Sequence, residues 1–249
     1  MDWLIGLKEQ FILNFIEGKR WEFLLIGFVN TILITVVSAI LGIIIGIVVA
    51  TIRTTYDNNV ESLQKKGGVG YYAFSVVNAI CKLYLTVVRG TPVVVQLLIM
   101  YFIIFATSNN GLMVAMLAFG INSGAYVAEI FRSGIMSIEH GQLEAGRSLG
   151  FNYYQTMFYI ILPQAVKNVL PTLLNEFIAL LKETSIAGYV GIMDLTKAGN
   201  NIRNHTYSPF MPLIAVALVY LVLVVLLTWV VGKLERRLRK GERHKHRSH

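Results

Sequence analysis

Two carboxylates, Glu176 and Glu183, lie in a stretch of the chain that is otherwise largely apolar. They are seven residues apart, so on an α-helix they fall on nearly the same face, about 10 Å apart along the axis. A charge in a membrane span costs roughly 3 kcal/mol, so such residues normally face a wet cavity or pair with a cation. Two explanations stay open. Either the acids bind a cationic ligand, or they form structural pairs, Glu183 with a neighbouring helix and Glu176 with Arg89 or Lys82.

A second polar group lies within the apolar run from Leu112 to Phe131. Asn122, Ser123 and Tyr126 stand in the middle of this run. Polar side chains at that depth are satisfied by neighbouring helices or line a wet cavity. We take these three residues as weaker candidates for ligand contact beside the two acids.

A polar insert, residues 137–163, separates two apolar stretches. It predicts two short helices joined at Gly150, because Asn152 is a suitable N-cap and Gln155 follows at capping-box spacing. The second helix is expected to end before Pro163, where the chain would turn back toward the membrane.

Apolar side chains stand at the corner of this insert, where Leu149 and Phe151 flank the glycine. If they are exposed, they suggest a surface for a protein partner; the alternative is that they pack back on the helix ends. The candidate docking residues are Glu144, Ala145, Gly146, Leu149, Gly150 and Phe151.

The rest of the chain has the apolar composition of a membrane protein. Of its 249 residues 55% are hydrophobic and only 14% are charged, and the mean hydropathy is +0.61, which is typical of an integral membrane protein. Since one span needs about 20 residues, we predict an all-α polytopic membrane protein with five transmembrane helices in a single domain, residues 1–249. The expected spans are 23–52, 71–107, 112–132, 164–186 and 208–232.

Three details of these spans can be predicted. Tyr56 to Gly70 is polar and ends in glycines, which favours a flexible loop. Pro92 should interrupt a helix, after which Val93 to Phe105 would complete the crossing. Gly42 and Gly46 provide a small-residue face for close helix packing.

The net charge of +8 indicates membrane topology and not nucleic-acid binding. Eight of the 22 Lys and Arg residues lie in the tail 233–249, against two of the 14 acids. A basic cluster directly after an apolar span places this tail in the cytoplasm, where contact with lipid headgroups is a second role. Five spans then put the N-terminus outside, the insert 137–163 in the cytoplasm and the loop Ala187 to His205 outside.

The sequence lacks the motifs that several classes of activity require. The sequence contains no Gly-xxxx-Gly-Lys-Ser/Thr phosphate loop, so the chain is not expected to hydrolyse ATP itself. It also contains no HExxH motif and no nucleophile with an evident base, so no catalytic or metal site is predicted. The alternatives to a transport subunit are a polytopic membrane enzyme or signalling subunit whose loop binds another cytoplasmic protein, and a passive channel.

The insert resembles the cytoplasmic loop of permease subunits of ATP-binding-cassette (ABC) importers. That loop has the pattern EAA, three residues, Gly, nine residues, Ile, one residue, Leu-Pro. The matching residues are Glu144-Ala145, Gly150, Ile160 and Leu162-Pro163. The chain departs from the pattern at Gly146, where alanine is usual. Because glycine in a helix costs roughly 1 kcal/mol relative to alanine, Gly146 is expected to loosen the first helix.

Further motifs resemble polar amino acid permeases of the histidine/glutamine/arginine type. They are Arg89-Gly90-Thr91-Pro92 with Gln96, Asn122-Ser123-Gly124-Ala125-Tyr126 with Ala128-Glu129, Asn175-Glu176-Phe177-Ile178, and Leu181-Lys182-Glu183-Thr184-Ser185. The resemblance implies a type I ABC importer permease fold, with a coupling helix around Glu144 to Gly150 that sits in a groove of the ATPase subunit.

The resemblance also implies partners and a cargo. A cytoplasmic ABC ATPase dimer would bind ATP and Mg, so this chain needs no cofactor, and a second permease subunit would complete a homodimer or a similar heterodimer. An extracytoplasmic substrate-binding protein would deliver an amino acid to a multi-pass permease in the bacterial cell membrane. In arginine-type relatives, carboxylates at the positions of Glu176 and Glu183 line the central site, which favours cationic groups of the amino acid as ligands. Relatives that carry neutral amino acids have the same two acids, so a basic substrate is only one option.

Overall fold

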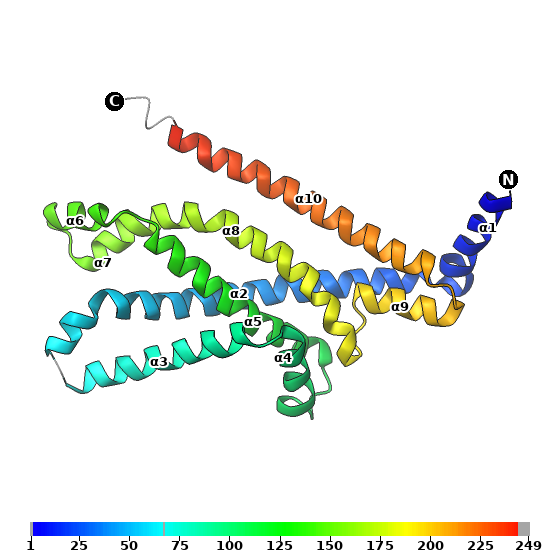
Figure 1. Ribbon diagram of the computed structural model, residues 1–249, viewed down its shortest axis with the longest axis horizontal. Coiled ribbons are helices and arrows are strands. Elements are labelled where there is room, and N and C mark those ends of the chain that lie inside the picture. The colour runs from blue at the N-terminus through cyan, green and yellow to red at the C-terminus, as the bar shows by residue number, and fades with distance from the viewer. Residues whose placement is uncertain (1, 67, 244–249) are drawn as a thin grey trace. The chain divides into compact units, whose positions relative to one another are not determined.

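Every regular element in the residues that the computed structural model describes, 2–66 and 68–243, is helical. The α-helices are α1 Asp2–Phe11, α2 Trp21–Lys66, α3 Val69–Gly90, α4 Val93–Ile99, α5 Gly111–Met136, α6 His140–Ser148, α7 Tyr153–Thr156, α8 Leu162–Glu183, α9 Leu195–Thr206 and α10 Phe210–Arg243 (Figure 1). Short π-helical turns lie at Ile12–Ile16, Met100–Ile104 and Met157–Ile161, and 3-10 turns at Glu17–Lys19 and Thr184–Val190. The predicted all-α class is confirmed.

The helices pack into two compact units, and each is described here by itself. Unit 1 contains the residues up to Ala39, Val93–Gly120 and Phe177–Trp229. Unit 2 contains Ile40–Pro92, Ile121–Glu176 and the residues from Val230 onward. Helices α2, α5, α8 and α10 each contribute residues to both units.

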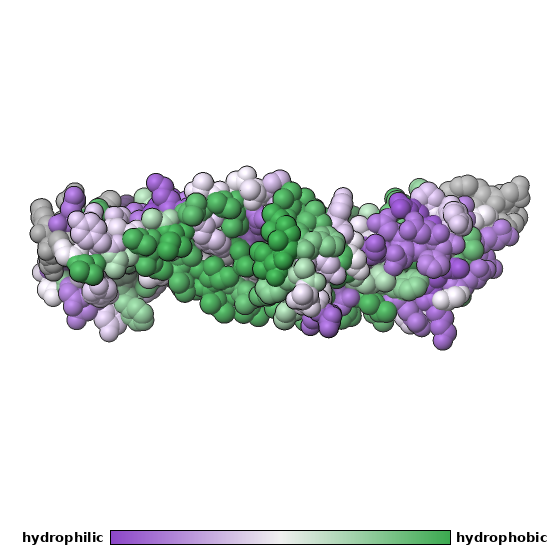
Figure 2. Space-filling view, turned by 90° about the horizontal axis from the view of Figure 1, so that it is seen from below, coloured by the Kyte–Doolittle hydropathy of each residue, from purple (hydrophilic) through white to green (hydrophobic). Residues whose placement is uncertain are grey.

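Five helical segments are long and apolar enough to cross a membrane, which confirms the predicted number of spans. They are Trp21–Asn58, Val69–Gly90, Gly111–Met136, Tyr153–Val190 and Phe210–Arg237. Their outward side chains are mostly apolar, and Figure 2 shows apolar side chains covering much of one face. Such a surface fits contact with lipid chains.

The expected second span, 71–107, is divided. Helix α3 ends at Gly90, and Thr91 is extended with φ −123° and ψ 146°, as expected for a residue before proline. The break at Pro92 is therefore confirmed. The 22 residues of α3 are long and apolar enough to cross a membrane by themselves, and Val93–Ile104 forms a separate, shorter apolar helix.

The expected loop from Tyr56 to Gly70 is largely helical. Helix α2 continues to Lys66, and α3 begins directly after Gly68, which has φ +91°. The extension of α2 is held against α3 by the ring of Tyr56, which lies 5.7 Å from that of Phe74. The polar segment from Tyr56 to Gly70 is therefore part of a helical hairpin of α2 and α3 and not a flexible loop (Figure 1).

Small residues allow close packing within unit 2. A Cβ atom on Gly46 would lie 2.7 Å from Cβ of Val127, and one on Gly42 would lie 3.0 Å from Oγ of Ser123. Both positions therefore exclude a larger side chain, which agrees with the predicted small-residue face of α2.

The expected outer loop, Ala187 to His205, contains helix α9. The buried carboxylate of Asp194 caps this helix by accepting hydrogen bonds from the backbone N–H groups of Thr196 (2.8 Å) and Lys197 (3.2 Å). Residues on one side of α9 are fully buried in unit 1, namely Leu195, Ala198 and Ile202. This amphipathic spacing stabilises a helix in a segment whose polar composition resembled a loop.

Candidate functional site

The polar insert folds as the predicted elbow. Helix α6 ends at a corner where the N–H of Leu149 donates to the carbonyl of Ala145 (3.1 Å) and the N–H of Phe151 to that of Gly146 (3.1 Å). Gly150, at the turn between them, has φ +83°, a conformation that favours glycine. The chain direction therefore changes within three residues.

A complete capping box starts α7. The Asn152 side chain accepts from the N–H of Gln155, and the Gln155 side chain accepts from the N–H of Asn152, both at 2.9 Å. The hydroxyl of Thr156 donates to the carbonyl of Asn152 (3.0 Å). The capping prediction is confirmed, and the start of α7 is fixed by local hydrogen bonds.

The structure gives Gly146 a different role from the expected one. Gly146 is buried, and a Cβ atom there would lie 2.7 Å from Oγ1 of Thr156. Thr156 is itself fully buried. Glycine therefore permits close contact between α6 and α7, a packing role that the expectation of a loosened helix did not include.

Pro163 does not break the chain as predicted. The helical path continues from α7 through the π-helical turn Met157–Ile161 into α8, and Pro163 is the second residue of α8. Proline is tolerated in the first turn of an α-helix, and Pro163 lies in the first turn of α8. In addition, the Gln164 side chain donates to the carbonyl of Ile160 (2.8 Å).

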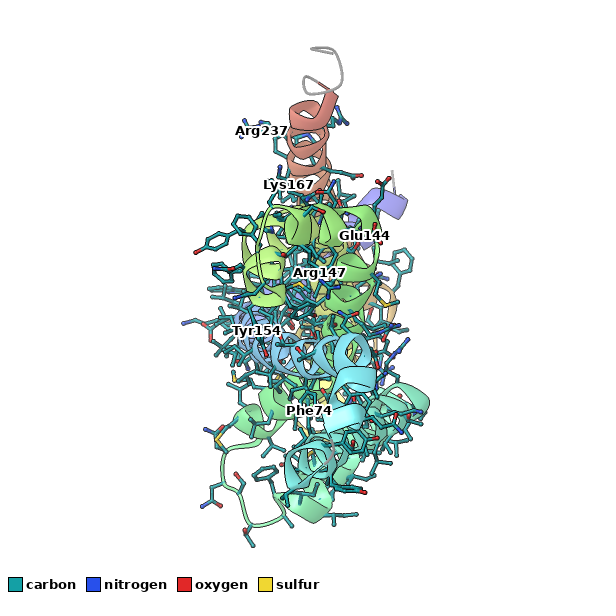
Figure 3. All side chains as sticks on the ribbon, turned by 90° about the vertical axis from the view of Figure 1, so that its left-hand side faces the viewer. Phe74, Glu144, Arg147, Tyr154, Lys167 and Arg237 are labelled. Carbon is teal, nitrogen blue, oxygen red and sulfur yellow. The ribbon has the colours of Figure 1, made fainter. Side chains whose placement is uncertain are left out.

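The elbow presents an apolar corner among charged residues. Leu149 is 73% exposed and Phe151 37% exposed, so these side chains do not pack back on the helix ends to become buried. Figure 3 looks onto this end of unit 2, with Glu144, Arg147 and Tyr154 labelled. Glu144, Ala145 and Arg147 are all exposed on α6. This arrangement suits an external partner that covers a small apolar centre with a charged surround.

Part of the polar cluster predicted within the spans is brought together in unit 2. The hydroxyl of Ser123 on α5 donates to Oε1 of Glu176 on α8 at 3.3 Å. Asn122 and Ser123 are each only 2% exposed. A carboxylate beside a buried hydroxyl presents oxygen atoms of the kind that bind a cationic group.

Tyr126 belongs to a second cluster, which sequence reasoning missed. Cζ of Arg89 lies 5.9 Å from the centroid of the Tyr126 ring, within cation–π range. A guanidinium nitrogen of Arg89 also lies 3.6 Å from Oε2 of Glu129. Glu129 in turn accepts two hydrogen bonds from Arg132, at 2.5 Å and 3.3 Å. The spacing of Glu129 and Arg132 could have predicted their pairing, but only the fold brings Arg89 of α3 to them.

Glu183 is the last residue of α8 and is partly buried. It belongs to unit 1, whereas Asn122, Ser123, Tyr126 and Glu176 belong to unit 2. Its membership of one site with Glu176 therefore stays a prediction.

Residues 67–240 match the family of inner membrane components of binding-protein-dependent transport systems. The chain belongs to this family. It is 39% identical over 166 residues to the arginine transport system permease protein ArtQ of Bacillus subtilis, covering 66% of this chain and 76% of ArtQ. It is 36% identical over 168 residues to the glutamine transport system permease protein GlnP of Escherichia coli K12, covering 66% of this chain and 77% of GlnP.

The fold of the permease is also similar to solved structures. A crystal structure of an amino acid ABC transporter with histidines matches with a TM-score of 0.77 and 34% identity, covering 89% of this chain and 96% of that one. The predicted permease family and importer fold are confirmed. The permease is thus a transport component and a multi-pass membrane protein.

Proposed function

We propose that this permease is the membrane-spanning subunit of an ATP-driven importer that takes up a polar amino acid from an extracytoplasmic binding protein. The two relatives described above are named for glutamine and arginine transport, and the family is defined by dependence on a binding protein. The observation that carries the proposal is the capped elbow of α6 and α7 with its exposed apolar corner. A basic amino acid is one option among polar cargoes.

The elbow would be the coupling surface for a cytoplasmic ATPase dimer. ATP and Mg would bind to those ATPase subunits, because the chain contains no phosphate loop. Its docking residues would be Glu144, Ala145, Gly146, Leu149, Gly150 and Phe151, with Gly146 acting through the packing of α6 on α7. A second permease subunit, identical or similar, would complete the membrane part.

The proposed orientation in a bacterial cell membrane has the C-terminus and the elbow in the cytoplasm and the N-terminus outside. The basic residues that follow the last span support this orientation. The single span Tyr153–Val190 then separates the elbow from α9, which would lie outside.

The substrate site would be built around Glu176 and Glu183. Glu176 with Ser123 offers oxygen atoms to an ammonium group, and Asn122 lies next to this pair in sequence. Glu183 would bind a second cationic group or polar end of the cargo. Tyr126 would act at the edge of the site through its contact with Arg89.

The test is transport by the complete complex in proteoliposomes, with its ATPase and binding protein. We expect uptake to require ATP, and Glu176→Gln or Glu183→Gln to reduce uptake and substrate-stimulated ATP hydrolysis about tenfold or more, since one lost charge contact of this kind is worth at least that factor. Glu22→Gln, an exposed acid in the first turn of α2, is the matched control and should behave as the parent protein.

The possible outcomes test the substrate site separately from the assignment as an importer. Uptake that persists in both Gln variants would contradict the site but not the importer. Solute flux through the permease without ATP would indicate a channel. Failure of the elbow to bind any ATPase would favour a signalling subunit or a membrane enzyme.

A further inference from the structure

A polar hollow lies on the surface of unit 1. Its volume is about 340 Å³. It is lined by one face of α9 and by the 3-10 turn that precedes it: Ser185, Gly188, Tyr189, Thr196, Lys197, Asn200, Arg203 and Asn204. Figure 2 shows hydrophilic side chains gathered over the region of α9.

The helix spacing explains why these side chains converge. Thr196, Asn200 and Arg203 follow one another at three- and four-residue intervals and so share a face of α9. The opposite face, with Leu195 and Ile202, is fully buried in unit 1. The packing of α9 therefore fixes its polar face toward the hollow.

The charge of the hollow is positive. Lys197 and Arg203 both line it, and its lining residues include no carboxylate. Asp194 lies close in sequence, but it is fully buried and its oxygens accept the N–H groups of Thr196 and Lys197. Two cations beside amide and hydroxyl donors form a site for a carboxylate.

We infer that this hollow docks an acidic side chain of the binding protein during delivery of the cargo, an inference that rests on the proposed function. A free amino acid would bring an ammonium group as well as its carboxylate, and that group would meet two cations. An Asp or Glu side chain of a protein brings the carboxylate alone. In the proposed orientation, in which one span separates the elbow from α9, the hollow lies on the side from which the binding protein approaches.

The test titrates binding protein into proteoliposomes that contain the complete complex, at low and at physiological salt, and measures ATP hydrolysis. In the double variant Lys197→Gln/Arg203→Gln, we expect the half-saturating concentration of binding protein to rise on the order of tenfold, with an unchanged rate at saturation and a weaker salt dependence. Lys8→Gln, an exposed cation on α1 in the same unit, is the matched control, and Arg203→Lys should stay close to the parent protein.

A cross-linking measurement covers the case in which the double variant does not assemble. Cys81 is the only cysteine in the chain, so Asn204→Cys in a Cys81→Ala background can carry a single photoreactive label. We expect light-dependent cross-links to the binding protein.

Three results would overturn the inference. One is an unchanged half-saturating concentration in the double variant, and another is the absence of cross-links from position 204. The third is a change only in the amino acid concentration needed at saturating binding protein, which would assign the hollow to the cargo. Loss of ATP-dependent uptake in the parent complex would instead contradict the proposed function.

Discussion

At the scale of single residues, the elbow depends on one close contact. The EAA pattern has an alanine at the position of Gly146, and from the pattern alone the glycine is expected only to loosen α6. The structure places it against Thr156, whose hydroxyl is held by the carbonyl of Asn152. Since a β-branched residue stands opposite, the glycine and the threonine complement each other in volume.

Restoring the usual alanine at this position should therefore destabilise the protein. We expect Gly146→Ala to lower the free energy of unfolding by about 1–3 kcal/mol, as overpacking typically does. Gly146→Ala/Thr156→Ala should be less destabilised than the sum of the single changes, because the methyl and hydroxyl that crowd the new Cβ are gone. Thermal unfolding of the detergent-solubilised protein measures all four members of this cycle. A gain in stability from Gly146→Ala alone would show that the helix propensity of alanine outweighs the contact.

At the scale of elements, local signals were sufficient where local contacts determine the structure. The capping box at Asn152 and the break at Pro92 were predicted because neighbouring backbone groups decide them. The helical extension of α2 was missed because its polar residues resemble a loop, and contacts such as Tyr56 with Phe74 come from another helix. The pairing of Ser123 with Glu176 is likewise tertiary, so the sequence could indicate these two residues but not their contact.

Helix α9 allows a test of one such element through its cap. Asp194→Ala removes the acceptor for two backbone N–H groups, which should cost about 1 kcal/mol. For a chain of this size that corresponds to a decrease in Tm of about 2–4 °C. Asp194→Asn keeps an acceptor oxygen and should lose much less. Equal losses in the two variants would contradict a capping role.

The same carboxylate should make stability depend on pH. Burial raises the pKa of Asp194 above its ordinary value of 3.8, although backbone hydrogen bonds from Thr196 and Lys197 lower it. The folded state then holds the proton more tightly than the unfolded state, so this contribution to stability is present at low pH and is lost as pH rises through the raised pKa. We expect the Tm of the parent protein, relative to Asp194→Asn, to fall as pH rises above 3.8. Parallel pH profiles would contradict this assignment.

At the scale of the whole molecule, one continuous helical path connects the proposed functions. The path from Tyr153 to Val190 begins at the elbow, carries Glu176 and Glu183, and ends beside the hollow lined by α9. In an importer, ATP-driven motion at the elbow must change access to the cargo on the other side of the membrane. In the proposed importer the elbow would pass this motion into the helical path, and it would have to hold its ATPase firmly to do so.

That requirement can be tested at the exposed corner of the elbow. Leu149 is 73% exposed, so Leu149→Ala should change the free energy of unfolding by no more than about 0.5 kcal/mol. If Leu149 inserts into the ATPase, the same change should weaken association about tenfold or more, as is typical of a central apolar contact. Ile103→Ala is the matched control, because Ile103 is similar in size and 71% exposed but lies far from the elbow in sequence. Co-purification of the ATPase and binding-protein-stimulated ATP hydrolysis should fall for Leu149→Ala only; equal retention in both variants would place the docking contact elsewhere.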